Sequence, residues 1–187
     1  MQASEDILKR ARRIRLVVMD VDGVLTDGAI ILSDVSESRN FSVRDGMGIS
    51  VARHAGLRFA VITGGRSAAV ERRAADLKID IVELQCTGKR TALEAMCAAE
   101  GLDISASAFI GDDWIDLPAM QVCGLSVAPA NAPYDIRREA HIVTSATGGH
   151  GAVREFLEWL LDAQGGWAAA ATRWVEANEL GQATLEQ

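Results

Sequence analysis

Short apolar runs alternate with longer segments of helical periodicity along this chain. Runs of β-branched and apolar residues predict strands at 14–20, 57–65, 79–84, 107–113, 125–130 and 141–145. Apolar positions at helical spacing predict helices at 48–56, 67–77, 89–101, 133–140 and 151–165. Because strands that alternate with helices form parallel β-α units, the sequence predicts an α/β fold with a doubly wound, mostly parallel, Rossmann-like sheet.

Two segments depart from this alternation. Residues 29–33 and 39–43 flank the polar stretch "DVSE" and predict a β-hairpin inserted after the first strand. At the other end, 166–187 begins with the second glycine of a Gly-Gly pair. The stretch "WAAAATRWVEANEL" that follows the pair is either helical, mobile or docked on a neighbour. The length of 187 residues is typical of one domain. We therefore expect a single domain at 1–165 and a C-terminal tail at 166–187.

Composition narrows the class of partner. The formal net charge is −7, which argues against nucleic acid because phosphate backbones select basic faces. The N-terminus lacks the apolar core of a secretory signal, and no apolar run reaches the roughly 18 residues of a membrane span. The three cysteines are well separated and form no CxxC pair, which favours free thiols in a reducing compartment. These features predict a cytoplasmic protein that binds neither membrane nor nucleic acid.

Chemistry-bearing side chains follow three of the predicted strands. Asp20 ends the first and Asp22 lies two residues beyond it, Thr63 and Gly64 lie near the end of the second, and Asp112 lies near the end of the fourth. Ligands of such sheets bind beyond the carboxyl ends of the strands, so these residues are expected to meet there. Converging carboxylates repel one another unless a cation lies between them, and hard oxygen ligands suit Mg²⁺. Asp and Gly also favour ordinary turns, which is the alternative interpretation of the first cluster.

Four motifs occur together in one order. "DVDGVLTDG", "ITGG", Lys89 and "GDDWID" resemble the nucleophile loop, strand-end hydroxyl, lysine and metal loop of phosphatases in the haloacid dehalogenase-like superfamily. The resemblance implies that Asp20 is a nucleophile that forms an aspartyl-phosphate and that Asp22 is a general acid and base. It further implies that Thr63 and the amide of Gly64 hold the phosphoryl group.

The same resemblance implies the charged groups around the phosphate. Lys89 would neutralise negative charge, and Mg²⁺ would be held by Asp20, Asp112 and the backbone carbonyl of Asp22, with Asp116 in support. Taken alone, Lys89 would be a solvated helix residue. Asp113 is expected to be the N-cap of the helix that follows it, and Ser67 to cap the helix at 67–77.

No cap domain fits between these motifs. Only 42 residues separate Asp20 from Thr63, and 25 separate Thr63 from Lys89. An uncapped site is open to water, so a neighbouring subunit is expected to close it. "VLTDG", "SESRNFSVRDGMGI" and "GGHGAVREFLEWLLDAQG" resemble the capless 3-deoxy-D-manno-octulosonate 8-phosphate (KDO 8-phosphate) phosphatase family. That resemblance implies a homotetramer acting on a sugar phosphate; nonulosonate 9-phosphate phosphatases and a non-catalytic assembly module remain alternatives.

A keto-deoxy sugar acid carries a carboxylate as well as a phosphate, so it needs further polar and cationic groups. The candidate substrate-binding residues are Thr63, Gly64, Arg44, Asp45, Arg66, Arg73 and Arg154. A solvated helix face is the alternative for Arg73. Two departures from the family pattern, Gly65 with Arg66 in place of an arginine after Thr-Gly, and Cys86 with Gly88 before Lys89, leave the identity of the sugar open.

Overall fold

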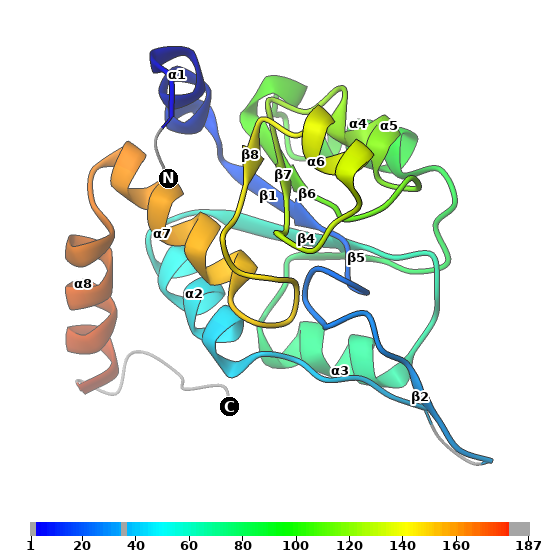
Figure 1. The fold of residues 1–187 in the computed structure, drawn as a ribbon. Helices are drawn as coiled ribbons and strands as arrows, with labels where there is room; N and C mark the ends of the chain where they lie inside the picture. Colours follow the sequence, from blue (N-terminus) through cyan, green and yellow to red (C-terminus); the bar gives the residue numbers. More distant parts are fainter. Residues whose placement is uncertain (1–2, 35–36, 180–187) are drawn as a thin grey trace.

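The computed structural model describes residues 3–34 and 37–179 as a three-layer α/β fold (Figure 1). Six parallel strands form the sheet in the order β5-β4-β1-β6-β7-β8. Their bounds are β1 Leu16–Met19, β4 Arg58–Ile62, β5 Ile81–Glu83, β6 Ser107–Ile110, β7 Leu125–Ala128 and β8 Ile142–Val143. The prediction of a doubly wound parallel sheet is confirmed.

Helices cover both faces of the sheet because alternate side chains of the central strand point to opposite sides. Val17 and Met19 of β1 face α1 (Glu5–Arg13), α2 (Val43–His54), α3 (Ala68–Asp76) and α7 (Ala152–Gln164). Leu16 and Val18 face α4 (Lys89–Ala99), α5 (Leu117–Met120) and α6 (Tyr134–Glu139). All four residues of β1 are buried, so this apolar run anchors two cores at once.

The strand order reverses beside β1. The chain runs from β1 to β4 and β5 on one side, then crosses to β6, β7 and β8 on the other. Such a switch point opens a crevice at the carboxyl ends of the central strands. Asp20, directly after β1, and Asp112, two residues after β6, therefore lie at this crevice.

The predicted hairpin is present but shorter and shifted. β2 (Ile31–Leu32) and β3 (Glu37–Ser38) pair antiparallel, and Figure 1 shows them projecting from the body of the protein. Within the expected second strand at 39–43, only Phe41 pairs, in a single bridge to Thr26. The rest of that stretch turns into α2, because Ser42 caps the helix by accepting a hydrogen bond from Asp45 N at 3.2 Å. Part of the "DVSE" turn lies outside the described residues.

Other boundaries also differ from the sequence predictions. The helix α1 and the 3₁₀ turn Ile104–Ala106 (η1) were not predicted. Ser67 occupies the N-cap position of α3, but its side chain makes no capping hydrogen bond; it bonds Glu37 of the hairpin instead. Asp113 is not an N-cap, because α5 begins at Leu117 with Asp116 in the capping position.

The C-terminal segment packs on the domain. α8 (Trp167–Glu179) contacts α2 and α7, and Trp174 Nε1 donates to Ser50 Oγ at 3.0 Å. The last part of the expected tail, 180–187, lies outside the described residues. Within 3–34 and 37–179, no helix is long and apolar enough to cross a bilayer.

Candidate active site

The loop after β1 turns sharply so that it can approach the loop after β6. Gly23 has a φ of +88°, and a Cβ at this position would lie 2.1 Å from Oδ2 of Asp112. The Thr26 hydroxyl donates to Val21 O at 3.3 Å and accepts from Gly23 N at 3.4 Å, which closes the turn. Glycine at position 23 is therefore required for the two acidic loops to meet.

A buried lysine joins two carboxylates. Lys89 Nζ lies 2.8 Å from Oδ1 of Asp20 and 2.6 Å from Oδ1 of Asp116. Lys89, Asp20 and Asp116 are 2%, 6% and 0% exposed. Burying a charge is costly unless it is paired, so this arrangement is stable only as a set. Lys89 comes from the first turn of α4, which places it at the same edge of the sheet as Asp20.

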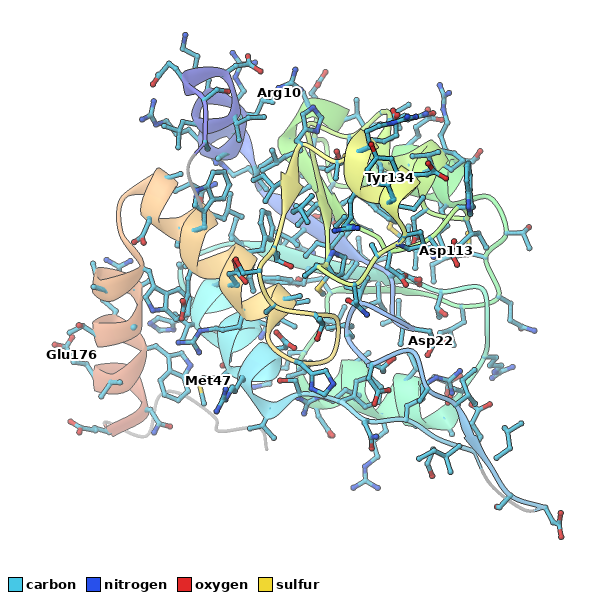
Figure 2. The ribbon with its side chains drawn as sticks, viewed as in Figure 1. Arg10, Asp22, Met47, Asp113, Tyr134 and Glu176 are labelled. Atoms are coloured by element: carbon cyan, nitrogen blue, oxygen red, sulfur yellow. The ribbon has the colours of Figure 1, made fainter. Side chains whose placement is uncertain are left out.

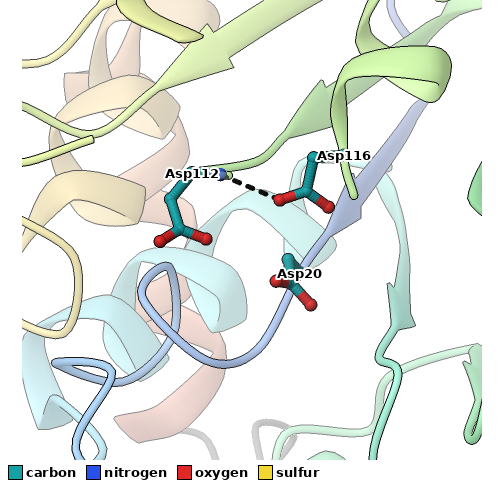
Figure 3. A group of neighbouring side chains, drawn as sticks. All are labelled: Asp20, Asp112 and Asp116. Carbon is teal, nitrogen blue, oxygen red and sulfur yellow. Dashed lines mark hydrogen bonds between the residues drawn. The ribbon is translucent and has the colours of Figure 1, made fainter. Parts of the chain in front are cut away.

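Asp116 orients the loop after β6. Its Oδ2 accepts a hydrogen bond from Asp112 N at 3.0 Å (Figure 3). It accepts a second from Asp113 N at 3.2 Å. With Oδ1 bound by Lys89, both oxygens of Asp116 are engaged by donors of the protein. Asp116 therefore supports Asp112 and Lys89, while the carboxylate of Asp112 remains available to a ligand.

The acidic cluster fits a divalent cation. One oxygen each of Asp20, Asp112 and Asp116 lie within 4.8 Å of one another. Burial, followed by repulsion from Asp116, raises the pKa of Asp20 to about 6, and the same two causes raise the pKa of Asp112 to about 7. Lys89 alone does not offset this repulsion. Hard oxygen donors with excess negative charge match Mg²⁺, and Asp20 and Asp112 are the residues that would hold it.

Asp22 lies on the loop that leads from β1 toward the hairpin (Figure 2). Its carboxylate is bound by Arg39, whose Nε lies 2.7 Å from Oδ1 and whose Nη2 lies 3.3 Å from Oδ2. The side chain of Arg39 is only 4% exposed, and Nη1 bonds Glu37. Sequence reasoning missed Arg39, because an arginine in a polar stretch 17 residues away carries no local signal for this contact.

The residues after β4 lie beside this cluster because β4 is a direct neighbour of β1. Thr63 is 3% exposed, and its hydroxyl accepts from Gly65 N at 3.4 Å. Gly64 lies near the loop after β6, since a Cβ there would be 3.7 Å from Cδ1 of Ile115. The ends of β1, β4 and β6 thus face one crevice.

The candidate substrate-binding residues are dispersed. Arg44 is exposed in the first turn of α2, and Arg66 is exposed and paired with Glu71 at 3.2 Å. Arg73 reaches from α3 to Ser42 O at 3.2 Å, beneath α2. Among the residues that the structure describes, none of these three side chains bonds Asp20, Asp112 or Asp116 within the single chain.

Arg154 and Asp45 belong to the junction of α2 and α7. Asp45 is 1% exposed and accepts from Gly151 N at 3.1 Å and Arg154 N at 2.8 Å, so it caps α7 from another helix. The guanidinium of Arg154 stacks 4.3 Å from the ring centroid of Trp167 and bonds Glu158 at 2.6 Å. The segments "VRDG" and "GGHGAVRE" are therefore packed together in the structure.

Comparisons with known proteins agree with this site. Residues 72–157 match the model of the haloacid dehalogenase-like hydrolases. The 3-deoxy-D-manno-octulosonate 8-phosphate phosphatase of Haemophilus influenzae is 40% identical over 158 residues, covering 84% of this chain and 88% of the relative. The Escherichia coli K12 protein of the same name is 40% identical over 163 residues, covering 87% of each chain.

A solved structure extends the likeness to three dimensions. The phosphatase of the same name from Moraxella catarrhalis, in complex with magnesium, phosphate and KDO, superposes with a TM-score of 0.87. It is 38% identical to this chain, and the match covers 90% of this chain and 97% of that one. The chain described here therefore belongs to the 3-deoxy-D-manno-octulosonate 8-phosphate phosphatase family of the haloacid dehalogenase-like hydrolases.

Proposed function

We propose that the protein is a Mg²⁺-dependent phosphatase that hydrolyses 3-deoxy-D-manno-octulosonate 8-phosphate to KDO and phosphate. The observation that carries the proposal is the set of buried Asp20, Lys89 and Asp116 with half-buried Asp112 at the crevice beside β1. The Moraxella catarrhalis relative, whose solved structure contains magnesium, phosphate and KDO, supports the substrate. The relatives from Haemophilus influenzae and Escherichia coli support the same activity.

The reaction proceeds in two displacements. A carboxylate oxygen of Asp20 attacks phosphorus, the bond between phosphorus and the ester oxygen breaks, and Asp22 donates a proton to that oxygen as the sugar leaves. In the second step Asp22, now ionised, takes a proton from water while the water oxygen attacks phosphorus. This attack breaks the bond between phosphorus and the Asp20 oxygen, which releases inorganic phosphate and restores the carboxylate of Asp20.

The surrounding residues stabilise the phosphoryl group. Lys89 offsets the negative charge of Asp20, and the hydroxyl of Thr63 with the amide of Gly64 contacts phosphoryl oxygens. Asp20 and Asp112, together with the backbone carbonyl of Asp22, would hold Mg²⁺, and Asp116 keeps Asp112 in place. When bound, Mg²⁺ neutralises phosphoryl charge and favours attack at phosphorus.

The assembly is the second part of the proposal. Ile30, Ile31 and Leu32 of the hairpin are 47%, 55% and 73% exposed, and an isolated two-stranded hairpin is marginally stable. We infer that hairpins of several subunits pack around a symmetry axis in a homotetramer, closing the open site. Arg44, Arg66, Arg73 and Arg154, with Asp45, would then serve the sugar acid within or across subunits.

Two further expectations accompany this function. We propose that 1–165 is the catalytic domain and that 166–187 is an accessory C-terminal segment, which is supported by the packing of α8 on the outside of α2 and α7. A cytoplasmic location is supported by the cysteines, since Cys86, Cys97 and Cys123 are all free thiols. The net charge of −7 argues against nucleic acid as a partner and leaves room for a small anionic substrate, which needs only a local basic site.

A phosphate-release screen tests the substrate. The purified protein is assayed with Mg²⁺ on phosphorylated eight- and nine-carbon keto sugar acids and on a simple phosphate ester. The highest kcat/KM is expected on KDO 8-phosphate. A preference for a nonulosonate 9-phosphate would reassign the sugar, and no turnover of any ester would indicate the non-catalytic assembly module.

A further inference from the structure

Asp22 is held on both carboxylate oxygens by one guanidinium. Nε of Arg39 lies 2.7 Å from Oδ1, and Nη2 lies 3.3 Å from Oδ2. A two-point contact between planar groups fixes the plane of the carboxylate as well as its distance. Asp22 is 30% exposed, so without such a contact its carboxylate would be free to rotate in water.

Arg39 is itself held firmly. Its side chain is 4% exposed, and Nη1 bonds Glu37, which in turn bonds the hydroxyl of Ser67. This chain of contacts links the start of α3, through the end of the hairpin, to Asp22. It also explains why Ser67 leaves α3 without a side-chain cap.

Gly65 leaves room for this arrangement. A Cβ at position 65 would lie 3.9 Å from Nη2 of Arg39, which is ordinary van der Waals contact. A long side chain there would compete with the guanidinium for the same space, and a basic one would also repel it. The glycine that follows Thr63 and Gly64 is therefore compatible with a cation that reaches the site from the hairpin.

We propose that Arg39 is a positioning residue for catalysis: it acts through Asp22 by fixing the orientation of the carboxylate that exchanges protons with the leaving group and with water. The proposal rests on the proposed function, in which Asp22 is the acid and base. In this proposal Arg39 acts on the carboxylate of Asp22 and not on the phosphoryl group. Its contribution enters through the orientation of Asp22, to which general acid–base catalysis is sensitive.

A double-mutant cycle between Arg39 and Asp22 tests the inference. Arg39→Gln is expected to lower kcat about 10- to 100-fold, as small misplacements of a catalytic group do, with KM nearly unchanged. Arg39→Lys, which keeps the charge but offers no planar fork, should recover part of the loss. In the Asp22→Asn background, Arg39→Gln should cause no further loss of kcat, because the carboxylate through which Arg39 acts is no longer present.

Two results would contradict the role proposed for Arg39. An additive loss in the Asp22→Asn background, or a raised KM with unchanged kcat, would overturn the proposal and assign Arg39 to substrate binding or folding. Arg72→Gln, an exposed arginine of α3, is the matched control and should retain activity. If Arg39→Gln fails to fold, the same cycle is run with Arg39→Lys, for which an additive loss carries the same negative meaning.

Failure of the proposed function can be distinguished from failure of the role proposed for Arg39. The cycle compares variants on any phosphomonoester that the wild type hydrolyses, such as p-nitrophenyl phosphate. If the wild type does not act on KDO 8-phosphate but the two substitutions are non-additive on the other ester, the substrate is wrong and the role of Arg39 stands. Melting temperature and light scattering establish that each variant keeps its fold and assembly.

Discussion

The ammonium of Lys89 lies 2.8 Å from the carboxylate of Asp20, and both side chains are almost completely buried. The same ammonium also binds Asp116, so one cation serves two carboxylates. Around the pair, Asp112 adds a third negative group. The site thus holds more buried negative charge than the chain itself compensates, which has consequences for both stability and activity.

Removing the lysine should destabilise the metal-free protein. Lys89→Met leaves Asp20 and Asp116 facing each other without a counter-ion, and breaking such a buried pair costs about 3–5 kcal/mol of the free energy of unfolding. Arg90→Met is the matched control, since its exposed pair with Glu94 is worth less than about 1 kcal/mol. Urea denaturation in the presence of a chelator measures both. Equal losses in the two variants would contradict the assignment of Lys89 as the essential counter-ion.

Replacing the nucleophile should abolish turnover and spare the fold. Asp20→Asn keeps the shape of the side chain but removes its nucleophilicity, so kcat should fall by several orders of magnitude. Phosphate release measures the loss, and circular dichroism measures the fold. Asp135→Asn, an exposed carboxylate on α6, should behave as wild type. If Asp20→Asn retains a tenth of the activity, about 1.4 kcal/mol in the barrier, Asp20 is not the nucleophile.

Removing the metal should abolish activity reversibly. Asp20 and Asp112 need a cation to remain close together in ionised form, and the phosphoryl group needs its charge offset. Excess chelator should stop phosphate release, and added Mg²⁺ should restore it. Full activity after metal removal has been verified by elemental analysis would exclude a metal-dependent reaction.

The raised pKa of Asp112 predicts how stability depends on pH. Its pKa is about 7 in the fold, against about 3.9 in an unfolded chain, so the folded state binds this proton more tightly. This proton therefore contributes to the free energy of unfolding of the metal-free protein at low pH, and the contribution is lost as pH rises through 7. Asp112→Asn should therefore raise the melting temperature of metal-free protein at pH 8, and the gain should shrink toward pH 5.

Magnesium provides the control for this experiment. At pH 8, Mg²⁺ should raise the melting temperature of the wild type by binding the ionised carboxylates, and should leave Asp112→Asn nearly unchanged. Calorimetry measures the melting temperature of each protein at pH 5 and at pH 8, with chelator and with Mg²⁺. A variant that is still stabilised by Mg²⁺ as strongly as the wild type would remove Asp112 from the metal site.

A charge on the hairpin should disrupt the assembly. Leu32 is 73% exposed in the single chain, so Leu32→Asp should leave the fold intact while preventing hairpins from packing together. Light scattering should show smaller species, and activity on KDO 8-phosphate should fall more than activity on a simple ester. Tyr134→Asp, at a 68% exposed position of α6, is the control. A fully active wild-type monomer at assay concentration would contradict a shared site.

The sequence by itself determined the sheet and the residues at its carboxyl edge. Alternating strand and helix patterns implied parallel strands, and parallel strands place their carboxyl ends at one edge whatever the details of packing. For that reason the positions of Asp20, Thr63 and Asp112 around one crevice were predictable. The need for a cation among them also followed from the repulsion between carboxylates.

Contacts between distant segments were decided only by the tertiary structure. Asp45 caps α7 from more than 100 residues away, Ser67 turns from its own helix to Glu37, and Arg39 reaches Asp22. Local sequence patterns encode burial and backbone conformation, whereas the partner of a polar side chain depends on which elements pack together. In the same way, the sequence of 39–43 predicts a strand, but in the structure Ser42 caps α2 at this point. The helix is favoured because it packs against α7, a contact that a hairpin strand would lack.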